Sequence, residues 1–299
     1  MIYRDTCLAA SDSFGSVSQK TCHNSPIRIG LALGGGFARG LAHAGVLKVL
    51  EERNIPIHCV AGVSAGSVAA AAFSSGASAR EIAEIGSAMR FKDVARLAIG
   101  RTGLVRTERM ELFLQKLLKR FRFEDMRIPL GIVATDLATG QPVVFRDRGE
   151  VTMPVRASCS YPGLFQPVQD GARLLVDGAM SMAVPSLVCR ALGATHVISV
   201  NLPSQGWKSA GANVFSVVNR CFQIVQSRTV RDCCSASDII ITPDVGSFGW
   251  NGFGKADELI RAGEKAARDA IATIETWISP SQPGPELFRR GYYPAVSKS

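Results

Sequence analysis

The stretch Gly62-Val63-Ser64-Ala65-Gly66 decides the fold, because a glycine on each side of a central serine allows a tight strand-to-helix turn that exposes the hydroxyl. Residues 57–61 form a short apolar run typical of a buried strand, and residues 67–74 are small residues typical of a packed helix. Ser64 is therefore a candidate nucleophile. The same pattern also occurs in ordinary turns, so a second feature has to support this hypothesis.

A glycine-rich loop, Gly34-Gly35-Gly36-Phe37-Ala38-Arg39-Gly40, supplies that feature. It follows an apolar strand pattern at residues 27–33 and precedes a helix pattern that begins at residue 42 and ends at residues 51–54. Backbone N–H groups at the start of a helix lie beside the positive end of the helix dipole. The loop therefore predicts a site for an anion.

The anion could be a nucleotide phosphate or the oxyanion that forms when a serine attacks a carbonyl. A dinucleotide site requires an acidic residue about 20 positions on, at the end of the second strand, and Ser64 ends that strand here. Glu51 and Glu52 lie too early, in the helix. A P-loop requires a lysine where Leu41 follows Gly40. An oxyanion hole beside a serine turn agrees with both observations.

Three blocks of the sequence together resemble the signature of the patatin-like phospholipase family. They are the glycine loop at 34–40, the serine turn at 62–66, and Asp177-Gly178-Ala179. Residues 134–140 and 156–165 are also similar to segments that bacterial members carry between the serine and the aspartate. The resemblance extends over residues 27–274, and three blocks in the family's order argue against chance agreement.

The resemblance implies a serine–aspartate dyad without a histidine, with Ser64 as the nucleophile and Asp177 as the general base. Residues 173–176 form a strand pattern, which places Asp177 where open α/β sheets bind ligands, although Asp-Gly is also a common turn pair. Among the four histidines, His43 is the only rival base, and we favour a loop-supporting role for it. A free carboxylate is a weak base, so the site has to desolvate or orient Asp177.

The expected oxyanion hole consists of the backbone N–H groups of Gly35, Gly36, Phe37 and Ala65. Phe37 stands where many family members have a further glycine, and a phenylalanine resists a positive φ angle and adds a ring near the acyl path. Arg39 is expected either to support the loop or to bind a lipid phosphate. The other expected supporting residues are Gly62, Gly66 and Gly178.

The length of 299 residues and the hydrophobic content of 46% allow one large core. Alternating strand and helix patterns, with the resemblance, predict a three-layer α/β/α patatin-like fold whose mostly parallel sheet carries helices on both faces. We expect an irregular leader at 1–25, one catalytic domain at 26–278 and a loose C-terminal tail at 279–299. Further strands are predicted at 129–135, 143–146, 196–201 and 238–242, and helices at 214–234 and 255–277.

The sequence predicts a cytoplasmic protein that is soluble or peripheral at the membrane. The leader lacks the apolar core of a signal peptide, and no segment reaches the roughly 18 apolar residues of a membrane span. The eight cysteines form no C-x-x-C pair suited to zinc, so we expect reduced thiols, no metal and no cofactor. The adjacent Cys233 and Cys234 are interpreted as ordinary helix residues.

The net charge of +9 favours polyanionic partners. No nucleic-acid-binding pattern is present, so we expect no nucleic acid and consider an anionic membrane surface instead. Residues 110–122 combine an apolar stripe with basic residues, which suits a membrane surface, but a helix packed on the core is the favoured interpretation. Residues 203–238 are a candidate flap over the site.

Two functions from different classes follow. The first is a serine acyl hydrolase of phospholipase A or lysophospholipase type, acting on phospholipids or other acyl-ester lipids through an acyl-enzyme intermediate. The second is a catalytically weak relative with a regulatory or lipid-binding role. Only Phe37 favours the second function, whereas the presence of both Ser64 and Asp177 favours the first.

Overall fold

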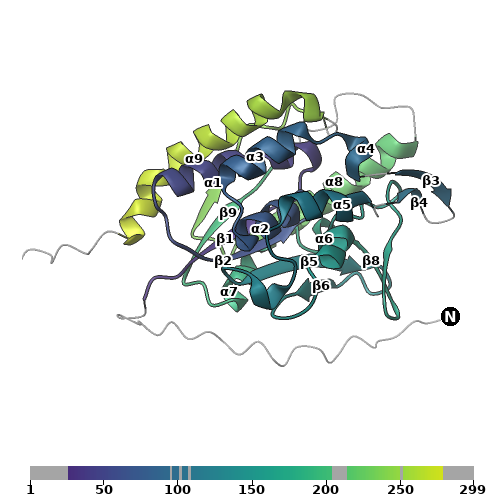
Figure 1. Ribbon diagram of the computed structural model, residues 1–299, viewed down its shortest axis with the longest axis horizontal. Helices are drawn as coiled ribbons and strands as arrows, with labels where there is room; N and C mark the ends of the chain where they lie inside the picture. Colours follow the sequence, from purple (N-terminus) through teal and green to yellow (C-terminus); the bar gives the residue numbers. More distant parts are fainter. Residues whose placement is uncertain are drawn as a thin grey trace, which may run out of the picture.

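The computed structural model describes residues 26–94, 96–100, 103–106, 109–203, 214–249 and 252–278. The leader predicted at 1–25 and the tail predicted at 279–299 lie outside these residues. In the described part, the chain forms a mixed sheet with helices on both faces, which confirms the predicted α/β class (Figure 1).

The main sheet has eight strands in the order β10-β9-β1-β2-β5-β8-β7, and β6 pairs with β5 outside this path. Neighbours from β10 to β5 are parallel, whereas β6, β7 and β8 pair antiparallel. The strands are β1 (Ile29–Leu33), β2 (Ile57–Val63), β5 (Leu130–Asp136), β6 (Pro142–Phe145), β7 (Val168–Asp170), β8 (Arg173–Asp177), β9 (His196–Val200) and β10 (Ile239–Ile241).

Helices cover both faces of this sheet. Figure 1 shows α1, α3 and α9 on one side of the sheet, drawn above it, and α7 on the other. The α-helices are α1 (Ala42–Glu52), α2 (Ala65–Ser75), α3 (Ala79–Ala88), α4 (Phe91–Val94), α5 (Arg109–Leu117), α6 (Thr152–Ser158), α7 (Ser186–Ala191), α8 (Val214–Cys234) and α9 (Ala256–Ile278). Short 3-10 helices are η1 (Phe37–Leu41), η2 (Phe123–Asp125), η3 (Gly178–Met180) and η4 (Gly252–Lys255).

The seven strands that the apolar runs predict are present, with ends shifted by one or two residues. The predicted helices α1, α2, α8 and α9 are present too, whereas the helix expected from residue 110 ends at Leu117. The antiparallel hairpin of β3 (Arg96–Gly100) and β4 (Gly103–Arg106) was not predicted. A hairpin of two short strands carries too few residues for a clear alternating pattern.

The central strands are apolar on both faces because helices cover both faces. Every residue of β1 is buried, and the last five residues of β2 are buried as well. Parallel strands enclosed between two helix layers have this continuous apolar character. The carboxyl ends of β1 and β2 lead directly into the glycine loop and the serine turn, so the core fixes where both begin.

Helices α1 and α9 cross with their backbones in contact. A Cβ atom at Gly45 would lie 2.0 Å from the carbonyl oxygen of Ile260, and a Cβ atom at Gly263 would lie 2.0 Å from the carbonyl oxygen of Ala42. Only glycine fits at either position. Because α1 continues the glycine loop through η1, this crossing also anchors the loop.

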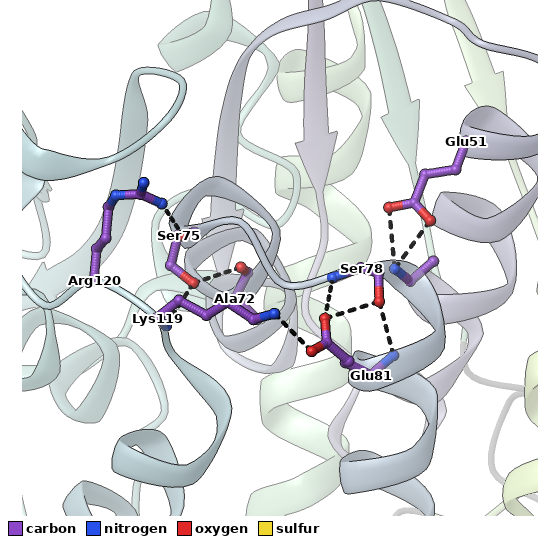
Figure 2. Close-up of polar contacts among 8 residues, drawn as sticks. Glu51, Ala72, Ser75, Ser78, Glu81, Lys119 and Arg120 are labelled. Carbon is purple, nitrogen blue, oxygen red and sulfur yellow. Dashed lines mark hydrogen bonds and ion pairs between the residues drawn. The ribbon is translucent and has the colours of Figure 1, made fainter.

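A polar cluster joins the end of α2 to the start of α3 (Figure 2). Ser78 caps α3 in a capping box with Glu81, whose carboxylate also accepts a 2.6 Å hydrogen bond from the Lys119 ammonium. The Ser75 hydroxyl accepts a hydrogen bond from the backbone N–H of Lys119 at 3.0 Å, and Glu51 of α1 accepts from the backbone N–H of Ala79. Capping groups of this kind contribute about 1 kcal/mol each. They join the segment after α5 to both α2 and α3, and they join α3 to α1.

The helix crossing predicts that Gly45→Ala destabilises the protein. The added methyl group meets backbone and not a movable side chain, so we expect a loss of about 1 to 3 kcal/mol in the free energy of unfolding, measured in urea. Gly254→Ala is the matched control, because, its chain neighbours aside, no atom of the described residues lies within 4 Å of a Cβ at that position. Equal stability of the two variants would contradict the close crossing.

Candidate functional site

Ser64 stands in a strained turn between β2 and α2. Its φ angle is 52° and its ψ angle is −127°, in a region that residues other than glycine rarely adopt. A Cβ at Gly62 would lie 2.4 Å from the carbonyl oxygen of Gly66, and a Cβ at Gly66 would lie 2.2 Å from that of Leu33. The turn therefore needs both glycines of the predicted pattern.

Two serine side chains hold the backbone of Ser64 in this conformation. Its N–H donates to the Ser158 hydroxyl at 2.8 Å, and Ser158 in turn donates to the carbonyl oxygen of Val133 at 2.6 Å. The Ser67 hydroxyl donates to the carbonyl oxygen of Ser64 at 2.6 Å. Sequence reasoning missed the role of Ser158, which lies between Arg156 and Ser160 in a stretch without a local pattern that marks it.

The side chains of Ser64 and Asp177 are in direct contact. The Ser64 hydroxyl donates to Oδ2 of Asp177 at 2.7 Å, although the two residues are 113 positions apart. The other carboxylate oxygen, Oδ1, accepts the backbone N–H of Ala179 at 2.9 Å. Both side chains are buried, with exposures of 7% for Ser64 and 1% for Asp177. The carboxylate is thus fixed by hydrogen bonds on both oxygens.

The sheet topology brings this pair together. Asp177 ends β8, which pairs antiparallel with the end of β5, while β2 pairs parallel with the start of β5. The next residue, Gly178, packs on backbone, because a Cβ there would lie 2.1 Å from the carbonyl oxygen of Val133. The Thr135 hydroxyl donates to the carbonyl oxygen of Asp177 at 3.0 Å. The carboxylate is therefore positioned by the core of the sheet and not by a surface loop.

Burial changes the acidity of Asp177. Desolvation raises the pKa of its carboxyl group to about 7, and the hydrogen bonds from Ala179 and Ser64 lower that pKa in part. An ordinary aspartate has a pKa of about 3.9. The buried carboxylate is consequently a much better proton acceptor than an exposed one, which meets the requirement that the sequence placed on Asp177.

His43 supports the glycine loop. It is fully buried, and its Nε2–H donates to the carbonyl oxygen of Gly34 at 2.8 Å. Burial lowers the pKa of the imidazole to about 4, so the ring is neutral at physiological pH. The loop-supporting interpretation of His43 agrees with these contacts.

Arg39 also supports the loop. Its Nε donates to the carbonyl oxygen of Gly36 at 3.2 Å, and its Nη1 donates to that of Pro203 at 2.9 Å. The side chain is only 7% exposed, and desolvation lowers the pKa of its guanidinium group. Of the two roles expected for Arg39, the contacts favour loop support.

The backbone amides of the loop differ in what they bind. The amide of Gly35 donates to the carbonyl oxygen of Ala183 at a long 3.4 Å. The amides of Gly36 and Ala65 donate to no acceptor in the described part of the chain, and Ala65 opens α2, where an N–H has no partner within the helix. One amide of the glycine loop and one of the serine turn therefore have no acceptor in the described part of the chain.

Phe37 adopts the conformation that a phenylalanine resists. Its φ angle is 51°, which costs roughly 1 to 2 kcal/mol for a residue with a side chain. The ring packs on Tyr161 with a centroid distance of 4.8 Å, and Tyr161 packs on Phe222 of α8 at 4.4 Å. These aromatic contacts help offset the backbone cost.

An apolar cavity of about 120 Å³ opens at Ser64. Helix α5 contributes Met110, Phe113 and Leu117 to the cavity wall, so the apolar stripe of that helix faces the interior. This agrees with the favoured interpretation of the segment as a helix packed on the core. The lining of the cavity comprises Phe37, Gly40, Leu41, Ala44, Ser64, Ala65, Val68, Ala69, Ile82, Gly86, Met89, Val94, Met110, Phe113, Leu117, Cys159, Phe165 and Phe253. A cavity of this composition suits a hydrocarbon chain.

Across the described residues, no three side chains of His, Cys, Asp or Glu come together as metal ligands. Within the same ranges, no helix combines the length and the apolar character needed to cross a bilayer. Cys234 is half-buried on α8, and the side chain of its neighbour Cys233 lies outside what the structure describes.

Comparison with known proteins gives a consistent assignment. Residues 31–189 match the family model described as patatin-like phospholipase. An uncharacterized NTE family protein of Mycobacterium tuberculosis is 31% identical over 292 residues, which cover 88% of this chain and 49% of the relative. Lysophospholipase NTE1 of Mycosarcoma maydis is 32% identical over 203 residues, 65% of this chain and 10% of that protein. The chain thus spans about half the length of the mycobacterial relatives.

The fold has a counterpart among solved structures. VipD from Legionella pneumophila superposes with a TM-score of 0.54 at 12% sequence identity, over 83% of this chain and 67% of that one. At this identity the likeness concerns the fold alone.

Asp177→Asn tests the buried charge through stability. An unfolded aspartate ionises near pH 4, whereas burial raises the pKa of folded Asp177 to about 7. Between pH 4 and pH 7 the folded state therefore binds one more proton than the unfolded state. Wild-type stability therefore falls as the pH rises through this range, and an asparagine avoids that loss. We expect the free energy of unfolding, measured in urea at pH 8, to be higher for the variant than for wild type by on the order of a few kcal/mol. Near pH 4 this difference should disappear. An identical difference at both pH values would contradict a buried ionisable group.

Proposed function

The chain belongs to the patatin-like phospholipase family, a family of lipid hydrolases, and we propose that it cleaves fatty-acyl esters of lipids with Ser64 as nucleophile and Asp177 as general base. The observation that carries this proposal is the 2.7 Å hydrogen bond between the two buried side chains. We propose a phospholipase A or lysophospholipase type; the family model is described as a phospholipase, and one relative is called a lysophospholipase. We assign the catalytic domain to residues 26–278.

In the first step, Ser64 Oγ bonds to the ester carbonyl carbon while its proton passes to Oδ2 of Asp177. The carbonyl electron pair moves onto oxygen and forms a tetrahedral oxyanion. When the carbonyl re-forms, the bond to the alcohol oxygen breaks, and that oxygen takes the proton from Asp177. The alcohol leaves, and the acyl group remains on Ser64.

In the second step, a water molecule attacks the acyl-enzyme while Asp177 accepts its proton. The bond between the acyl carbon and Ser64 breaks, Ser64 Oγ recovers the proton from Asp177, and the fatty acid leaves. The carboxylate thus serves twice as base and twice as acid, which suits a group whose pKa burial raises to about 7.

We assign the oxyanion to the amides beside the serine turn. Gly36 and Ala65 are the principal donors, because neither amide donates to the described part of the chain. Phe37 and Gly35 complete the hole, and the long 3.4 Å contact of Gly35 with Ala183 is weak enough to be exchanged for an oxyanion. Each donor of this kind contributes about 10² to 10³ in rate.

The apolar cavity at Ser64 receives the acyl chain in this proposal. Its walls carry no charged side chain, and it shares Ser64 and Ala65 with the reacting centre. Phe37, the residue that favoured a catalytically weak relative, lines this cavity and packs on Tyr161. Binding to an anionic membrane surface and the absence of nucleic-acid binding remain predictions from the sequence.

Hydrolysis of p-nitrophenyl butyrate by the purified protein tests the dyad. We expect Ser64→Ala and Asp177→Asn each to lower kcat/KM by about 10³-fold or more, because each removes a group that the first step requires. Asp170→Asn is the matched control: it makes the same chemical change in the edge strand β7 and should keep the wild-type rate. A wild type no faster than either dyad variant would favour the weak, lipid-binding alternative.

A further inference from the structure

A second cavity, of about 230 Å³, borders the glycine loop at Gly35. It has no lining residue in common with the apolar cavity that opens at Ser64. Its wall combines residues from after β8 and β9 with one face of α8. The lining consists of Gly35, Ala183, Asn201, Leu202, Pro203, Gln223, Gln226, Ser227 and Val230.

This second cavity lies next to the reacting centre. The point where a Cβ of residue 35 would lie is 3.2 Å from the Cβ of Ser64 and 3.6 Å from Nε2 of Gln226. The same point is 3.4 Å from the Cβ of Ala179, whose backbone N–H binds the carboxylate of Asp177. Gly35 is therefore in contact with the nucleophile, with the residue that binds the general base, and with Gln226 of the second cavity.

The alcohol half of an ester has to lie close to the general base. The leaving oxygen takes its proton from Asp177, so the alcohol must be within reach of the carboxylate when its bond breaks. The acyl half, by contrast, has the apolar cavity, which is lined by Ser64 and Ala65. Two cavities of different chemistry thus match the two halves of one substrate.

The polar groups of the second cavity are amides and a hydroxyl. The side chains of Asn201 and Gln226 are half-buried, and within the described chain neither has a hydrogen-bond partner. Gln223 accepts a long 3.5 Å hydrogen bond from Arg220. An amide side chain offers both donors and an acceptor, which is the complement of a hydroxyl group.

The lining residues carry no charge. A phosphate placed among them would lose water without gaining a cation, because the nearby Arg39 already donates to the carbonyl oxygens of Gly36 and Pro203. A hydroxyl group meets no such penalty. A second acyl chain in its place would leave the amides of Asn201 and Gln226 unpaired.

We propose that this cavity binds the alcohol half of the ester through its free hydroxyl groups, with Asn201 and Gln226 as specificity-determining residues. The preferred substrates are then esters of a glycerol-type alcohol with one acyl chain, which narrows the types proposed above to the lysophospholipase type, with any phosphate held outside this cavity. This inference rests on the proposed function, since it assigns the alcohol side of the same reaction.

Two soluble esters test it, 1-monobutyrylglycerol and propyl butyrate, which share the acyl chain and the three-carbon alcohol and differ in two hydroxyl groups. We expect wild-type kcat/KM to be at least about tenfold higher for the glycerol ester. Gln226→Met and Asn201→Leu keep the approximate shape and remove the amide, and each should lower this preference about threefold to tenfold. Gln141→Met is the matched control, because Gln141 is exposed and lines neither cavity.

The preference of wild type for the glycerol ester can be measured without any variant. If wild type showed no such preference, the inference would be overturned even if a substituted protein failed to fold. An unchanged preference in both folded variants would overturn it as well. Ser64→Ala separates this result from the proposed function: loss of hydrolysis of both esters supports the dyad whatever the preference. Hydrolysis that persists in Ser64→Ala would instead contradict the proposed function.

Discussion

The buried hydrogen bond between the Ser64 hydroxyl and the Asp177 carboxylate is the interaction on which the rest of the site depends. It joins the ends of two strands that lie 113 residues apart in sequence, so it exists only when the sheet has its full register. Because the pair is removed from water, the pKa of Asp177 rises to about 7. The same burial that makes the carboxylate a useful base makes its charge costly to the fold.

Two residues of the site also have backbone conformations that cost free energy, and identifiable contacts stabilise each of them. Ser64 and Phe37 both have positive φ angles. Ser158 and Ser67 bind the backbone of Ser64, and Tyr161 packs on the ring of Phe37. The buried side chains of His43 and Arg39 bind carbonyl oxygens of the glycine loop, which leaves the loop amides directed elsewhere. Local strain of this kind is characteristic of sites that have to be organised before a substrate arrives.

Local patterns in the sequence predicted much of this arrangement. The apolar runs located the strands of the main sheet, and the glycines around Ser64 predicted the turn, because no residue with a Cβ fits at Gly62 or Gly66. The pairing of Asp177 with Ser64 could be expected only from the resemblance, since strand order is not a local property. The contact of Ser158 with Ser64, and the approach of Gln226 to Gly35, join distant segments, and no local pattern marks either of them. The loop-supporting role of Arg39 depends in the same way on Pro203, 164 positions away.

The most direct test of the buried base is the pH dependence with which a fluorophosphonate ester labels Ser64, measured by mass spectrometry of the modified peptide. This reagent reports activation of the serine without a lipid or an alcohol leaving group. With a base whose pKa is about 7, wild-type labelling should rise about tenfold per pH unit below that value and then level off. Asp177→Asn should label slowly at every pH. Labelling of that variant at the wild-type rate, or wild-type labelling independent of pH, would contradict the assignment of Asp177 as the base.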